Sequence, residues 1–150
     1  MDGITHINIY SKGRTFLGQA LSNFADTPIE TVDGTFRSIE GYWYWLGCSD
    51  MYPYKEDFRV LVGAEAKKRG REAGARDWLE APLFKLKIYN AMLTKLILHD
   101  DILLKFLNNK LPFRHYYIFK NKIVEPKEGE WIINMWTFLQ GELCKSQATI

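Results

Sequence analysis

Glu40 is the carboxylate whose surroundings best suit acid–base chemistry. It precedes a glycine and four aromatic residues, Gly41 and then Tyr42-Trp43-Tyr44-Trp45. A carboxylate among aromatic rings loses hydration, which raises its pKa toward the range that a general acid or base needs at neutral pH. Gly41 is costly inside a helix, so we expect a ligand or another backbone segment to lie close to it. In the alternative interpretation, Glu40 faces solvent or pairs with an arginine such as Arg37.

A basic run at residues 66–71 (AKKRGR) is a candidate phosphate-binding segment. Helical spacing puts Lys67 and Arg71 on one face, where together they could hold a diphosphate, and Arg69 lies between them in the sequence. Arginine supplies forked donors that match phosphate oxygens. Trp78 follows the run and could stack on a base. The alternative is a solvated basic helix face without a ligand.

Two further residues are candidates for contact with a nucleotide. Asn23 carries both a donor and an acceptor, which suits a base edge or a ribose hydroxyl, although Ser-Asn pairs are also ordinary turn residues. Trp131 opens the last predicted helix and could be either a stacking surface or a core residue. The sequence therefore predicts a site built from one carboxylate, one amide, several cations and an aromatic ring.

Metal and nucleophile motifs are absent from the sequence. Cys48 and Cys144 are far apart, and the three histidines do not cluster, so a zinc site has no support and both cysteines are expected to be reduced. Glycine-rich phosphate loops and Ser-His-Asp arrangements are not found either. We therefore expect no metal and no organic cofactor.

Length and composition predict one globular domain over residues 1–150. The chain is 47% apolar and 15% aromatic, which is too hydrophobic for a disordered protein. It has no apolar run of about 18 residues and no apolar signal-peptide core near its start, so we expect a soluble, cytoplasmic protein without membrane contact. The net charge of +2 is far from that of a dedicated duplex binder, and it is compatible with a nucleotide phosphate as ligand.

The periodicity predicts a mostly helical α+β fold with short strands. Strands are expected at 6–10 and 29–32, and a hairpin at 115–125 that turns at Lys120-Asn121. Helices are expected at 36–46, 59–71, 82–98, 102–107 and 131–143. The residues expected to face the core are Val60, Leu61, Ala64 and Ala66 in the second helix, Leu86, Leu93, Leu96 and Ile97 in the third, and Trp131, Met135, Phe138 and Leu139 in the last.

In order along the chain, these segments resemble the NADAR family, whose YbiA-like members are known as N-glycosidases. The matching segments are the strand at 7–10, residues 21–24, residues 28–36, Ser38-Ile39-Glu40 with the aromatic residues after it, the basic run at 66–71, Arg76-Asp77-Trp78 and the long helix that follows. The match covers about residues 7–107.

The resemblance implies a compact helical fold and cleavage of an N-glycosidic bond to ribose. Its substrates would be phosphoribosyl intermediates of riboflavin synthesis or ADP-ribose attached to guanine in nucleic acid. Glu40 would be the catalytic glutamate, with Asn23, Arg71 and Trp78 around the ribose-phosphate pocket. In this hypothesis Lys67 or Arg69 assists Arg71 at the phosphate, and Trp131 is an alternative stacking residue.

The chain also departs from the family pattern. Gly41 stands where the family has histidine, and the family's lysine near Gly47 is missing. The family's C-terminal motifs are poorly preserved at residues 123–131. These differences favour a second hypothesis, a catalytically inactive module that binds ADP-ribose or nucleotides, or another protein. A third is that the basic run binds nucleic acid directly, although the low net charge predicts no strong binding to an unmodified duplex.

Overall fold

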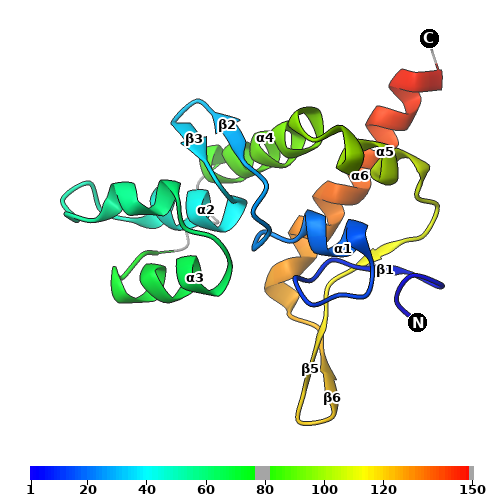
Figure 1. Cartoon of the computed structure of the whole chain (residues 1–150), viewed down its shortest axis with the longest axis horizontal. Coiled ribbons are helices and arrows are strands. Elements are labelled where there is room, and N and C mark those ends of the chain that lie inside the picture. Colours follow the sequence, from blue (N-terminus) through cyan, green and yellow to red (C-terminus); the bar gives the residue numbers. More distant parts are fainter. Residues whose placement is uncertain (77–81, 149–150) are drawn as a thin grey trace. The chain divides into compact units, whose positions relative to one another are not determined.

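The chain is mostly helical with several short strands, as the periodicity predicts (Figure 1). The fold is taken from a computed structural model, which describes residues 1–76 and 82–148. The chain divides into two compact units. The central unit is Asn23–His99, and the terminal unit combines Met1–Ser22 with Asp100–Ile150. Each unit is described by itself below, and a single NADAR-like domain over residues 1–150 stays a prediction.

The central unit consists of a β-hairpin and helices packed around it. Its elements are β2 (Ile29–Thr31), β3 (Gly34–Phe36), α2 (Ile39–Gly47), the 3-10 helix η1 (Lys55–Arg59), α3 (Gly63–Glu72) and α4 (Pro82–Leu98). Strands β2 and β3 are antiparallel and are joined by a turn at Val32-Asp33, so the predicted strand at 29–32 is one residue too long; Gly34, the first residue of β3, has a φ of 108°. Helix α4 packs on β2 and on α2, and α2 packs on α3 and η1. Helix α2 is therefore surrounded by the other elements of its unit.

The terminal unit brings the two ends of the chain together. Its elements are β1 (Ile7–Asn8), α1 (Phe16–Leu21), α5 (Asp100–Asn108), β4 (Phe113–Arg114), β5 (Tyr117–Phe119), β6 (Lys122–Val124), the 3-10 helix η2 (Lys127–Gly129) and α6 (Glu130–Ala148). Strands β1 and β4 are parallel, and the Asn8 side chain extends the pairing through two hydrogen bonds with the Tyr116 backbone, at 3.0 and 2.9 Å. Phe106 and Trp136 are fully buried.

The predicted helix at 36–46 starts three residues too early. Phe36 belongs to β3, where it pairs with Ile29, and its ring packs 4.7 Å from that of Tyr42. The helix begins only after Ser38, whose hydroxyl accepts a hydrogen bond from the Gly41 N–H at 3.0 Å. The turn at Val32-Asp33 reverses the chain before this point, so Phe36 continues a strand.

The predicted faces of two central helices are partly wrong. On α4, Leu96 is buried as expected, but Leu86 is 53% exposed and Ile97 is also exposed, whereas Ile88 and Met92 are fully buried. The helix is apolar nearly all round, so periodicity alone does not select its buried face. Helix α3 begins at Gly63 rather than Arg59. Its Ala66 is fully buried as predicted, but Val60 and Ala64 are exposed.

The last helix and the second hairpin are closer to expectation. On α6, Leu139 is buried as predicted, Trp131 and Met135 are partly buried, and Phe138 is exposed, while Trp136 takes the central core position. Strands β5 and β6 form the expected hairpin, with positive φ at Lys120 and Asn121. None of the helices in residues 1–76 and 82–148 is long and apolar enough to cross a membrane.

Candidate functional site

Glu40 lies in the first turn of α2 and is only 9% exposed. Ser38, which is fully buried, fixes the start of this helix: it accepts from the Gly41 N–H and donates to the Leu61 carbonyl at 2.9 Å. A carboxylate in the first helical turn is favoured by the helix dipole. The fold therefore holds Glu40 in a fixed, largely desolvated position, and it rules out the solvent-facing alternative.

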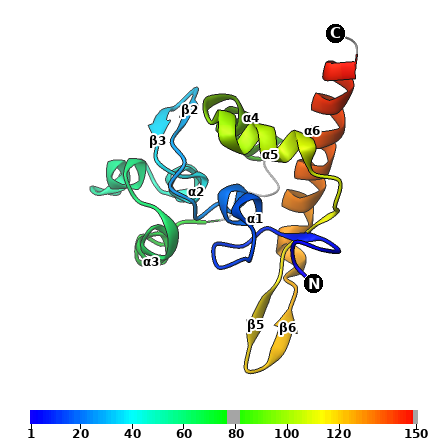
Figure 2. The same ribbon diagram turned by 45° about the vertical axis from the view of Figure 1, so that its right-hand side comes forward.

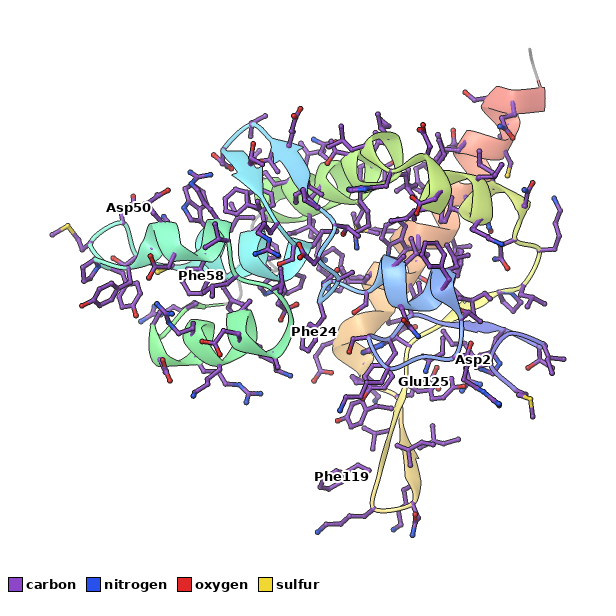
Figure 3. The ribbon with its side chains drawn as sticks, in the orientation of Figure 1. Asp2, Phe24, Asp50, Phe58, Phe119 and Glu125 are labelled. Carbon is purple, nitrogen blue, oxygen red and sulfur yellow. The ribbon has the colours of Figure 1, made fainter. Side chains whose placement is uncertain are left out.

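The segment Asn23-Phe24 joins the starts of two helices. The Glu40 N–H donates to the Asn23 carbonyl at 2.9 Å, and the Gly63 N–H, at the start of α3, donates to the Phe24 carbonyl at 3.1 Å. Phe24 and Phe58 are labelled in Figure 3 on the segments beside α2 and α3. Two of the predicted site residues, Asn23 and Glu40, are thus neighbours through their backbones, although they are far apart in the sequence.

The amide oxygen of Asn23 is an unusual polar atom. It is buried, and no hydrogen-bond donor in the described residues reaches it. A buried acceptor without a donor costs about 1–3 kcal/mol, so such atoms are uncommon and call for an explanation. A ligand hydroxyl or N–H would satisfy it. This oxygen is therefore a buried acceptor for which the described residues supply no donor.

The close approach expected at Gly41 is confirmed. A Cβ atom at this position would lie 2.3 Å from the Phe58 carbonyl oxygen and 2.9 Å from that of Leu61. Of the two alternatives left open by the sequence, the neighbour is another backbone segment. Gly41 thus lets the chain at 58–61 pack directly against the first turn of α2, which contributes to the burial of Glu40.

The four aromatic residues after Glu40 have packing partners. Tyr42 and Trp45 lie against Phe36, Trp43 meets Phe84 edge to face at 4.9 Å, and Tyr44 lies 6.3 Å from Phe58. Lys55 lies over the Trp45 ring at 4.2 Å. The aromatic run therefore anchors α2 to the surrounding elements, with Tyr42 fully buried and the other three rings partly buried.

Asp33, which is partly buried, forms a second polar group beside α2. The Tyr42 hydroxyl donates to its carboxylate at 2.7 Å, and the Lys87 amine lies 3.0 Å away. Burial acts to raise the pKa of Asp33, but these two hydrogen bonds and the charge of Lys87 hold it below the usual value. Burial and the bond to Asp33 raise the pKa of Tyr42. Asp33 thus links β2–β3 to α2 and α4 through Tyr42 and Lys87.

The basic run lies on α3, which packs directly on α2. Gly70 makes this possible, because a Cβ there would lie 2.2 Å from the Tyr44 ring. Arg69 is held by Asp57 at 2.8 Å. Arg71 is exposed and Lys67 partly exposed, and within the described part of the chain neither has a carboxylate in ion-pair range. Lys68 is exposed and unpaired by the same criterion, so Lys67, Lys68 and Arg71 are the cations of the run available to a phosphate, and Lys67 and Arg71 are the two on one face.

The remaining predicted residues are placed as follows. Trp78 lies outside the described residues. Trp131 is at the start of α6 in the terminal unit and is partly buried. Arg37, the suggested partner of Glu40, pairs with Asp26 instead. Among residues 1–76 and 82–148, no group of three or more His, Cys, Asp or Glu side chains is placed to hold a metal ion.

Lys95 is a titratable residue that the sequence analysis missed. It lies in α4, is completely buried, and burial lowers its pKa from 10.5 to about 7. Such a lysine is partly neutral at physiological pH, and its amine can then accept a proton or attack a carbonyl. Lys95 falls on the same helix face as Ile88, Ala91 and Met92, and only the structure shows that this face is the buried one.

Comparison with known proteins identifies the fold. No protein-family model and no curated protein matches the sequence. Among solved structures, the chain is similar to the NMR structure of the Escherichia coli protein YbiA, with a TM-score of 0.71 and 19% sequence identity over 97% of this chain and 92% of that chain. The expected α+β fold is thereby confirmed, and it is the fold of YbiA.

Proposed function

We propose that this protein is an N-glycoside hydrolase that cleaves the bond between ribose and nitrogen in a phosphoribosyl or ADP-ribosyl substrate. The proposal rests on two neighbouring residues at the start of α2: the buried carboxylate of Glu40, and Asn23, which has an unsatisfied amide oxygen and is joined to Glu40 by a backbone hydrogen bond. The fold shared with YbiA and the order of the motifs support it.

The reaction needs groups that this part of the chain supplies. Breaking a ribosyl–nitrogen bond develops positive charge on the ring oxygen and on C1, and the leaving nitrogen takes a proton. In our proposal the Glu40 carboxylate stabilises that charge and activates the water that attacks C1. The Asn23 oxygen accepts a hydrogen bond from a ribose hydroxyl, which would satisfy this buried atom and orient the sugar.

Phosphate binding is assigned to α3. Arg71 is the principal ligand in this proposal, with Lys67 four residues before it on the same face of the helix. Arg69 has a weaker claim because Asp57 already holds its guanidinium. Stacking on the base is assigned to Trp78, as the resemblance implies.

The substitution Glu40→Gln tests the catalytic assignment. It retains shape and removes the negative charge, so we expect turnover to fall by about two orders of magnitude or more while ligand binding persists. The matched control is Glu65→Gln, an exposed glutamate in the first turn of α3, which should retain full activity. Release of base or amine from ADP-ribosylated guanine and from phosphoribosyl amines of riboflavin synthesis is measured by mass spectrometry.

Two results would contradict the proposal. Normal turnover by Glu40→Gln would remove this residue from catalysis. Saturable binding of ADP-ribose by the unaltered protein, with no release from either group of substrates, would identify a binding module on the same fold.

A further inference from the structure

The β5–β6 hairpin is a two-stranded sheet that exposes large apolar side chains. It extends away from the helices of the terminal unit in both ribbon views (Figures 1 and 2). Ile118, Phe119 and Ile123 are all exposed, and Phe119 projects to the side of the hairpin near its turn, with 59% of its surface accessible (Figure 3). A two-stranded hairpin is only marginally stable by itself, and exposed apolar residues do not stabilise it further. Such residues are typical of a surface that contacts another molecule.

One face of this hairpin carries a row of aromatic rings. Tyr117 and Phe119 are two residues apart on β5 and so point to the same side, and the ring of Tyr10 lies 6.5 Å from that of Tyr117. Residues two apart on a strand are separated by about 6.6 Å, roughly twice the 3.4 Å spacing of stacked bases. We call Tyr10, Tyr117 and Phe119, with Lys120 and Lys122, the hairpin face.

The charge on this face is positive. Lys122 is paired directly with Phe119 across the hairpin, and the Lys120 amine lies 5.4 Å from the Phe119 ring. In the described residues, neither lysine has a carboxylate in ion-pair range. The acidic residue that follows β6, Glu125, is neutralised by Arg114 at 2.9 Å, and this bond lowers the pKa of Glu125. The hairpin face therefore combines accessible cations with aromatic rings.

We propose that the hairpin face binds single-stranded nucleic acid. Phe119 and Tyr117 stack on bases, and Lys120 and Lys122 contact the phosphates that flank them. Aromatic rings beside cations are the common basis of binding to unpaired strands, because every base offers a face for stacking. A paired duplex hides those faces, so single strands are preferred. The proposal is independent of the hydrolase assignment, since it concerns different residues and an unmodified strand.

The arrangement fits nucleic acid better than a membrane. A loop that inserts into lipid places its apolar residues at the tip and its lysines behind them, where they reach the headgroups. Here the turn itself is Lys120-Asn121, and the apolar residues lie on the sides of the strands. The hairpin is therefore suited to lateral contact with a polyanion.

Fluorescence anisotropy with a labelled oligo(dT) of about 12 nucleotides, within the usual site size, tests the ring contact. We expect Phe119→Ala to weaken binding about tenfold, the effect of losing one stacked base. The matched control is Phe16→Ala, which removes a phenylalanine of the same unit with 52% exposure and should leave affinity unchanged. Circular dichroism melting curves check that both variants are folded.

The salt dependence tests the lysines separately. Each phosphate contact on a single strand contributes about 0.7 to the slope of log affinity against log salt concentration. The double variant Lys120→Ala/Lys122→Ala should therefore reduce the slope by about 1.4. Lys105→Ala/Lys110→Ala, which removes two exposed lysines of the same unit, should leave it unchanged.

Three results would overturn the proposal: no binding by the unaltered protein at low salt, equal loss in the Phe119 and Phe16 variants, or binding to phosphatidylserine vesicles without binding to the oligonucleotide. All measurements are repeated with Glu40→Gln, whose affinity for the strand should match that of the unaltered protein. Loss of hydrolysis in Glu40→Gln therefore tests only the proposed hydrolase activity. Loss of strand binding in the hairpin variants tests only the proposed binding of nucleic acid.

Discussion

Lys95 shows how burial changes the chemistry of one residue. Its pKa of about 7 in the folded protein lies below the 10.5 of an exposed lysine, because burial penalises the charged amine. Between these two pKa values the unfolded chain binds more protons than the folded one. Folding stability therefore rises with pH across this window, with a slope approaching about 1.4 kcal/mol per pH unit, and the full penalty applies below it.

This predicts a pH-dependent effect of Lys95→Met. The methionine fills a similar volume without an amine, so the variant should be more stable than the unaltered protein near pH 7, and its advantage should shrink toward pH 10. Urea unfolding at several pH values measures the difference. An unchanged pH profile would mean that the Lys95 amine stays charged in the folded protein.

At the scale of elements, glycines decide how α2 and α3 meet. Gly41 admits the backbone at Phe58 and Leu61, and Gly70 admits the ring of Tyr44. Without these two positions α3 could not approach α2, and the basic run would move away from the turn that carries Glu40. The separation of the cations from the carboxylate is therefore set by helix packing.

The substitution Gly70→Ala tests this packing. The added Cβ would overlap the Tyr44 ring, so we expect a loss of about 1–3 kcal/mol in the free energy of unfolding and weaker binding of ADP-ribose. Gly141→Ala in α6 is the control, because no atom lies within 4 Å of its Cβ and alanine should stabilise the helix by up to about 1 kcal/mol. Equal effects of the two substitutions in urea titrations would contradict the assigned role of Gly70.

At the scale of the whole molecule, the terminal unit depends on contacts between distant parts of the chain. Strand β1 pairs with β4 more than a hundred residues later, whereas the central unit is continuous in sequence. We expect the two units to open separately. Ile88 and Phe106 are fully buried, one in each unit, and hydrogen exchange measured by mass spectrometry tests this expectation. Ile88→Ala should accelerate exchange mainly in the central unit, and Phe106→Ala mainly in the terminal unit. Uniform acceleration by either substitution would indicate one cooperative unit and support the single domain expected from length.

Local signals in the sequence were sufficient for many of the elements. Pro82 predicts the first turn of α4, and Lys120-Asn121 between two apolar runs predicts a hairpin; each depends on neighbours within a few residues. Thr35 and Ser38 are both possible caps for the helix that carries Glu40, and only the structure shows that this helix begins after Ser38 rather than at residue 36.

Only the tertiary structure decided which surfaces of these elements are buried. The exposure of Leu86, the burial of Lys95 and the unsatisfied oxygen of Asn23 depend on segments far away in the sequence. Helix α4 is apolar nearly all round, so several of its faces could pack against a core. The elements that contact it in the folded protein determine which face is buried. The residue types are thus a property of the chain, while desolvation, and with it the chemistry of the site, is a property of the packed fold.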